Sequence, residues 1–86
     1  MKNYFSQKLI DAQPWSQNLD DNRFMALISC AFNMGLHGLL ECYQLLDYLQ
    51  SNQWQQAHDD CLGLLAAKQA PSRYNQIANI FLTGKL

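Results

Sequence analysis

The chain has 86 residues and a formal net charge of −1. Its few lysines and arginines are scattered, so no basic stripe exists to neutralise phosphates, which disfavours nucleic acid as a partner and weakens binding to anionic wall or lipid. No apolar run approaches the roughly 18 residues of a membrane span, and the first residues lead into no apolar stretch. We therefore expect neither a membrane segment nor a signal peptide, and a cytoplasmic location.

The amino-acid usage favours helices. Valine is absent and threonine occurs once, at Thr83, so residues that prefer strands are scarce. The three cysteines, Cys30, Cys42 and Cys61, are odd in number and lack CxxC spacing. We expect free thiols in a reducing compartment.

The first predicted helix is short. One face of this helix carries Tyr4, Phe5, Leu9 and Ile10, and the helix is broken at Pro14-Trp15.

A longer helix is predicted over residues 21–34. Asp20 is a good N-cap, because its carboxylate accepts amide protons at the positive helix end. Gly35 is expected to supply a left-handed residue after the helix. Helical spacing predicts one apolar face made of Phe24, Leu27, Ile28, Ala31 and Phe32.

Shorter helical segments follow. The predicted ranges are 36–42, 43–50, 54–62 and 64–69, then a last helix that Pro71 starts and Thr83-Gly84 closes. Its buried face is predicted to contain Tyr74, Ile77, Ala78 and Phe81.

These elements predict an all-α fold, a single compact domain of about five to six short helices around a central buried helix. We divide the chain into residues 1–19, a segment that packs on or covers the core, and residues 20–86, the helical domain.

Two motifs within residues 20–86 point to a family. Arg23-Phe24-Met25-Ala26-Leu27-Ile28 and then Phe32-Asn33-Met34-Gly35 resemble the central helix of phage-type lysozymes of T-even bacteriophages, in glycoside hydrolase family 24. The resemblance covers roughly 70 residues without a gap. Further matches are Pro14, Leu19, Asp20, Gly38, Leu46, Leu49-Gln50, Trp54, Ala57, Pro71, Arg73, Phe81 and Thr83-Gly84.

The resemblance implies the C-terminal helical lobe of that fold, which forms one wall of the sugar cleft. In the family a preceding lobe carries the catalytic Glu, Asp and Thr. Here Glu41 is the only glutamate, and Asp11 is the only acidic residue before Asp20. Since glycoside hydrolysis needs a positioned carboxylic acid, we expect no enzyme activity and assign no catalytic residue. Ala66 and Ala67 also stand where the family has bulky aromatic residues.

Several residues are candidates for a binding surface. The resemblance places Asn33 and Gly35 where family members touch sugar, although helix capping alone explains Gly35. Apolar side chains of residues 1–19 could cover the core or anchor a partner. The candidate surface comprises Tyr4, Phe5, Trp15, Asn33, Gly35 and His37.

Other groups of potentially reactive side chains do not form a recognisable metal or catalytic site. His58 and Cys61 are one helical turn apart, but two ligands do not make a metal site, so we expect no metal and no cofactor. Asp59-Asp60 point about 100° apart on a helix and do not share a substrate. A nucleophilic pair of Cys42 with His37 stays open at this point.

The sequence therefore predicts a non-catalytic, lysozyme-derived protein that acts by protein–protein contact. The resemblance suggests a phage- or prophage-encoded inhibitor or decoy of a host protein, such as a defence (anti-CRISPR-type) target. The alternatives are a peptidoglycan-binding module and one half of a split phage lysozyme. The expected partner is a protein of unknown identity or a second copy of the chain.

Overall fold

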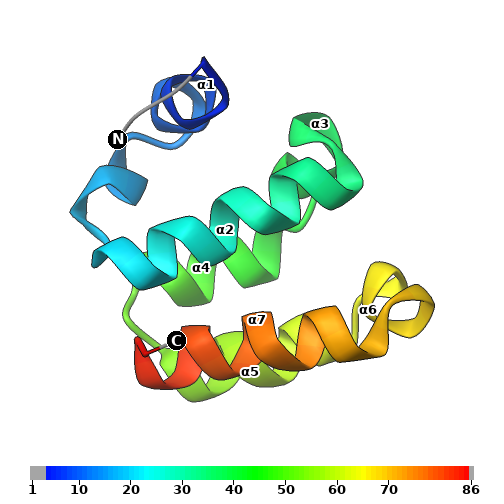
Figure 1. Ribbon diagram of the computed structural model, residues 1–86. Helices are drawn as coiled ribbons and strands as arrows, with labels where there is room; N and C mark the ends of the chain where they lie inside the picture. The colour runs from blue at the N-terminus through cyan, green and yellow to red at the C-terminus, as the bar shows by residue number, and fades with distance from the viewer. Residues whose placement is uncertain (1–3, 86) are drawn as a thin grey trace.

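The computed structural model describes residues 4–85, and the side chains of residues 6–85. Over that range the chain is all-α, with seven α-helices, one 3₁₀ helix and no strand (Figure 1). No helix in this range is long and apolar enough to cross a bilayer. In chain order the elements are α1 (Tyr4–Ala12), η1 (Pro14–Asn18), α2 (Asp21–Met34), α3 (Leu36–Leu40), α4 (Tyr43–Gln50), α5 (Trp54–Leu62), α6 (Leu65–Gln69) and α7 (Pro71–Thr83).

The ends of α2 follow local chemistry. The Asp20 carboxylate accepts a hydrogen bond from the Arg23 amide at 3.2 Å, which confirms the predicted N-cap. Gly35 follows the helix with φ +82° and ψ 150°. Its positive φ favours glycine, but its ψ differs from the expected left-handed helical value. The chain consequently turns directly into α3 at Gly35.

The buried face of α2 is rotated from the predicted one. Leu27, Ile28 and Ala31 are buried as expected, whereas Phe32 is 63% exposed. The inner face is centred on residues 26, 27, 30 and 31, and a helix turns by about 100° per residue. Placing Phe32 on the buried face was therefore wrong, because it lies outside this arc.

The core is formed mainly where α2, α4, α5 and α7 meet. α5 packs against both α4 and α7, and α2 runs beside α7 (Figure 1). Every predicted inner residue of α7 is buried, and so are Leu9 and Ile10 of α1. The largest fully buried side chains are Leu9, Leu27, Leu39, Leu45, Leu49, Tyr74 and Phe81.

Arg23 joins the first turn of α2 to the last turn of α7. Its Nε donates to the Phe81 carbonyl at 2.8 Å, and its Nη2 donates to the Leu82 carbonyl at 3.1 Å. These carbonyls end α7 and would otherwise lack helical partners. The neighbouring Asn22 side chain donates to the Gly84 carbonyl at 2.9 Å. α2 and α7 are therefore fixed together at this end.

Candidate functional site

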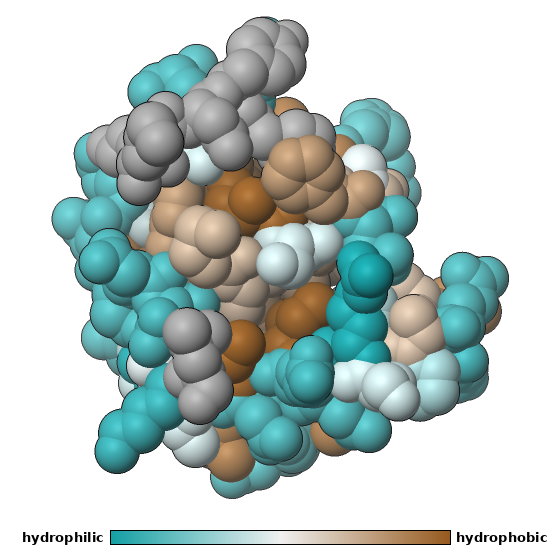
Figure 2. Space-filling view, in the orientation of Figure 1, coloured by the Kyte–Doolittle hydropathy of each residue, from teal (hydrophilic) through white to brown (hydrophobic). Residues whose placement is uncertain are grey.

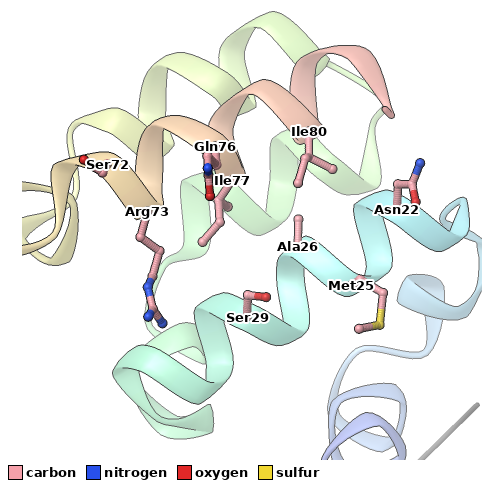
Figure 3. A pocket seen from close by; sticks show the side chains of 9 residues that line it. All are labelled: Asn22, Met25, Ala26, Ser29, Ser72, Arg73, Gln76, Ile77 and Ile80. Atoms are coloured by element: carbon pink, nitrogen blue, oxygen red, sulfur yellow. The ribbon is translucent and has the colours of Figure 1, made fainter. Parts of the chain in front are cut away.

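A groove lies between α2 and α7 beyond this junction, and its volume is about 580 Å³. Figure 3 shows the side chains that line it, which come from facing turns of the two helices. α2 contributes residues spaced by three and four positions, as does α7, so each helix presents one stripe to the groove. The lining residues are Asn22, Met25, Ala26, Ser29, Ser72, Arg73, Gln76, Ile77 and Ile80.

The groove has an apolar floor and a polar rim. Figure 2 shows hydrophobic residues in the hollow between α2 and α7, bordered by hydrophilic ones. Met25 is 55% exposed, which is high for a large apolar side chain. Arg73 is the single charged residue among those that line the groove. Among the described residues its guanidinium makes no hydrogen bond or ion pair, so it is available to an incoming acceptor.

The composition of the groove suits binding better than acid–base chemistry. No carboxylate lines it, and neither does a histidine or a cysteine. Proton transfer to a glycosidic oxygen needs a carboxylic acid at the reacting bond. The groove also lacks an aromatic ring on which a sugar could stack. Apolar contact and hydrogen bonding are therefore what its residues can supply.

None of the candidate residues predicted from sequence lines this groove. Asn33 is exposed near the end of α2, and its Oδ1 accepts a hydrogen bond from the Tyr74 hydroxyl at 2.8 Å. Burial raises the pKa of Tyr74 to about 12, so this hydroxyl remains a donor at neutral pH. Part of the Asn33 amide is thus used to hold α2 against α7.

The other candidates lie apart from one another. Gly35 is exposed, and His37 pairs with Glu41 at 2.9 Å on α3. Trp15 lies in η1, half-buried against the core, and its Nε1 donates to the Gln13 side chain at 2.7 Å. The side chains of Tyr4 and Phe5 lie outside the described residues.

Asp59 and Asp60, the adjacent carboxylates on α5, lie in different surroundings: Asp59 is exposed and Asp60 is half-buried. Asp59 contacts the His58 ring at 2.8 Å, and the hydrogen bond from His58 lowers the pKa of Asp59. Burial raises the pKa of Asp60. Within residues 4–85 no three His, Cys, Asp or Glu side chains are grouped to hold a metal ion.

The three thiols are free, and they are protected in different ways. Cys30 and Cys61 are fully buried. The contact with Cys61, together with burial, raises the pKa of Cys30 well above its usual value. The Cys42 thiol faces the Gly38 carbonyl at 3.6 Å and the Met34 sulfur at 3.9 Å. Since His37 pairs with Glu41, the structure shows no Cys42–His37 nucleophilic pair.

Sequence reasoning missed the groove because it treated α2 and α7 separately. Arg73 was noted only as a match to the lysozyme pattern. Met25 was named only as part of the motif that resembles the family, and Gln76 was not named, since neither lies on the buried face of its helix. An available signal was the apolar Met25 on the outer side of α2, opposite the apolar Ile80 near the end of α7.

Comparison with known proteins identifies the family. The family model for phage lysozyme matches residues 3–74. Probable T4-type lysozyme 1 of Dictyostelium discoideum is 30% identical over 70 residues, which cover 81% of this chain and 41% of the relative. Probable T4-type lysozyme 2 of the same organism is 32% identical over 69 residues, which cover 80% of this chain and 41% of the relative. No solved structure matches the chain. The chain thus spans less than half the length of these relatives. It belongs to the phage lysozyme family.

Proposed function

We propose that this chain is the C-terminal helical lobe of the phage lysozyme fold and acts as a non-catalytic binding module. In this proposal, the α2–α7 groove takes up a segment of another protein. The observation that carries the proposal is the lining of the groove: an apolar floor with Met25 exposed beside it, uncharged polar side chains and Arg73 at the rim, and no acid. An inhibitor or decoy role is one form that such binding would take.

A protein segment fits this lining better than a glycan does. Met25, Ile77 and Ile80 favour aliphatic or aromatic side chains, whose burial supplies most of the free energy of a protein contact. Arg73 favours a carboxylate at one end of that segment. The net charge of −1 gives little attraction toward an anionic cell wall.

The test is affinity purification from the source cells with wild type and the Met25→Glu variant, followed by mass spectrometry. Because Met25 is 55% exposed, the substitution changes the groove without opening the core. The expected result is a protein that wild type and the Gln55→Glu control retain and Met25→Glu loses. Strong sedimentation of the chain with purified sacculi, unaffected by Met25→Glu, would instead favour the peptidoglycan-binding alternative.

A second candidate function is one part of a lysozyme that is completed by a separate catalytic lobe. In this candidate, the catalytic lobe corresponds to the part of each relative that the chain does not match, since the match covers 41% of each relative's length. Murein turnover should be measured with the chain alone and with the chain mixed with the unmatched part of a relative. Turnover that appears only in the mixture supports the second candidate, whereas turnover by the chain alone contradicts the non-catalytic proposal.

A further inference from the structure

The outer face of α7 carries a row of side chains with a hollow on each side. Ser72, Gln76 and Ile80 follow one another at intervals of four residues, so they form one ridge along the helix. Figure 3 shows these three side chains on successive turns of α7. Gln76 and Ile80 line the α2–α7 groove and also a second hollow of about 590 Å³. The two hollows therefore have this row, which we call the α7 ridge, as their common wall.

The second hollow lies between the α7 ridge and a parallel row on the same helix. Asn79 and Thr83 are also four residues apart, so they form that row. Both are exposed, as are Ser72 and Gln76 of the ridge. The residues that line the second hollow are Gln76, Asn79, Ile80, Thr83 and Lys85.

A ridge between two hollows suits the packing of another α-helix. When a ridge of residues spaced by four enters a groove between residues spaced by three on a second helix, the axes cross at about 20°. Two rows of side chains of the second helix then lie in the two hollows, and its axis stays nearly aligned with α7. Ile77 and Ile80 favour aliphatic side chains in the row that enters the α2–α7 groove.

The charged residues of this surface are cations. Arg73 lines the α2–α7 groove in the first turn of α7, and Lys85 lines the second hollow just after the helix ends. Within residues 6–85, no carboxylate lines either hollow. Both cations are exposed, and the ion pairs in this part of the chain join other side chains. The two positive charges therefore favour carboxylates on a segment that covers the ridge.

The separation of the two cations sets the spacing of those carboxylates. Because a helix rises by about 1.5 Å per residue, Arg73 and Lys85 lie about 18 Å apart along the axis of α7. On a partner helix, residues about eleven positions apart differ by roughly 20° in direction and by about 16 Å along the axis. Two carboxylates at that spacing reach both cations from one face.

We propose that the occupant of the α2–α7 groove is an acidic amphipathic α-helix of another protein. It packs along the α7 ridge, with aliphatic side chains in the groove and carboxylates paired with Arg73 and Lys85. This inference rests on the function proposed for the groove, and it adds the conformation and the charge of the partner segment. A second copy of this chain does not fit ridge against ridge, because the cations of one copy would face those of the other.

The direct test measures the binding of three synthetic helical peptides by fluorescence anisotropy. The peptides share a leucine stripe and carry glutamate, glutamine or lysine at two positions about eleven residues apart on one face. We expect the glutamate peptide to bind about tenfold more tightly than the glutamine peptide, and the lysine peptide to bind most weakly. A fourth peptide, with proline at the centre of the glutamate sequence, should lose binding because proline breaks a helix.

Variants of the chain test the two cations. Arg73→Gln and Lys85→Gln should each weaken binding of the glutamate peptide about threefold. Lys68→Gln is the matched control, because Lys68 is exposed on α6 and lines neither hollow, and it should change the affinity less than about twofold. Absence of binding, equal affinity for the glutamate and lysine peptides, full binding of the proline peptide, or equal losses in Arg73→Gln and Lys68→Gln would overturn the inference. A dimer in solution that Gln76→Arg disrupts would also overturn it, since a second copy would then cover the ridge.

Met25→Glu separates this inference from the function proposed for the groove. If affinity purification with Met25→Glu loses a protein that the double variant Arg73→Gln/Lys85→Gln retains, the groove binds a partner but the partner segment is not an acidic helix. If Met25→Glu retains both that protein and the glutamate peptide as well as wild type does, the groove is not the binding site and both proposals fail.

Discussion

The guanidinium of Arg23 lies 3.8 Å from the centroid of the Trp54 ring. The same guanidinium caps the last carbonyls of α7 and donates to Asp20 at 3.0 Å. One side chain thus joins the start of α2, the start of α5 and the end of α7. The junction also sets one end of the α2–α7 groove, because Asn22 both lines the groove and bonds to the Gly84 carbonyl.

We expect Arg23→Lys to destabilise the fold by about 2 kcal/mol, since lysine keeps the charge but cannot bond two carbonyls while stacking on an indole ring. Urea unfolding followed by circular dichroism measures the change. Arg73→Lys is the matched control, because Arg73 is exposed and forms no such bonds. Equal stability of the two variants would show that the junction contributes little.

Gly84→Ala should destabilise the fold by about 1–2 kcal/mol. Gly84 has φ +73°, and a Cβ there would lie 3.1 Å from the Arg23 guanidinium. Gly63→Ala is the matched control, because Gly63 has φ −86° and a Cβ would meet its nearest neighbour at 3.5 Å. Thermal melts of both variants check the difference, and a Gly84→Ala melt as high as that of Gly63→Ala would contradict it.

The Tyr74 hydroxyl makes the free energy of unfolding depend on pH in the alkaline range. Its pKa is raised to about 12 in the folded chain, from a usual value of 10.0. The unfolded chain therefore releases this proton at a lower pH than the folded chain does. The stabilisation that protonated Tyr74 gives the folded chain is complete below pH 10 and is lost as the pH rises toward 12. The free energy of unfolding should fall more steeply over this range in wild type than in Tyr74→Phe.

Cys30 also has a raised pKa, but it is present in both proteins and its effect cancels in the comparison. Identical slopes for wild type and Tyr74→Phe would remove Tyr74 as the cause. At neutral pH, Tyr74→Phe should cost about 1 kcal/mol through loss of the bond to Asn33.

Leu27→Ala should destabilise the fold by about 2–5 kcal/mol, because Leu27 is fully buried in α2 and its removal leaves a cavity in a small core. Leu62→Ala removes the same atoms from a side chain that is 36% exposed, and should cost much less. Chemical unfolding of both variants tests the contrast. A Leu27→Ala variant that melts within a few degrees of wild type would indicate that the core collapses around the gap.

Helix ends were predicted well because they depend on residues close in sequence. Asp20 caps α2 through an amide three residues away, and Pro71 occupies the first turn of α7. The buried face of α7 was also predicted, since helical spacing alone defines it. Contacts between residues far apart in sequence could not be predicted in this way. The side-chain oxygen of Asn33, which the resemblance placed at a sugar contact, accepts a hydrogen bond from Tyr74, a residue 41 positions away.

The sequence by itself determined an all-α chain, most of its helix ends and its likeness to phage lysozymes, because propensity, capping and apolar spacing act over a few residues. Tertiary structure alone decided that Phe32 faces outward, that Arg23 stacks on Trp54, and that α2 and α7 leave a groove between them. These features depend on the angles and distances at which helices pack. Such angles and distances follow from many side chains filling one core together, and no local pattern encodes them.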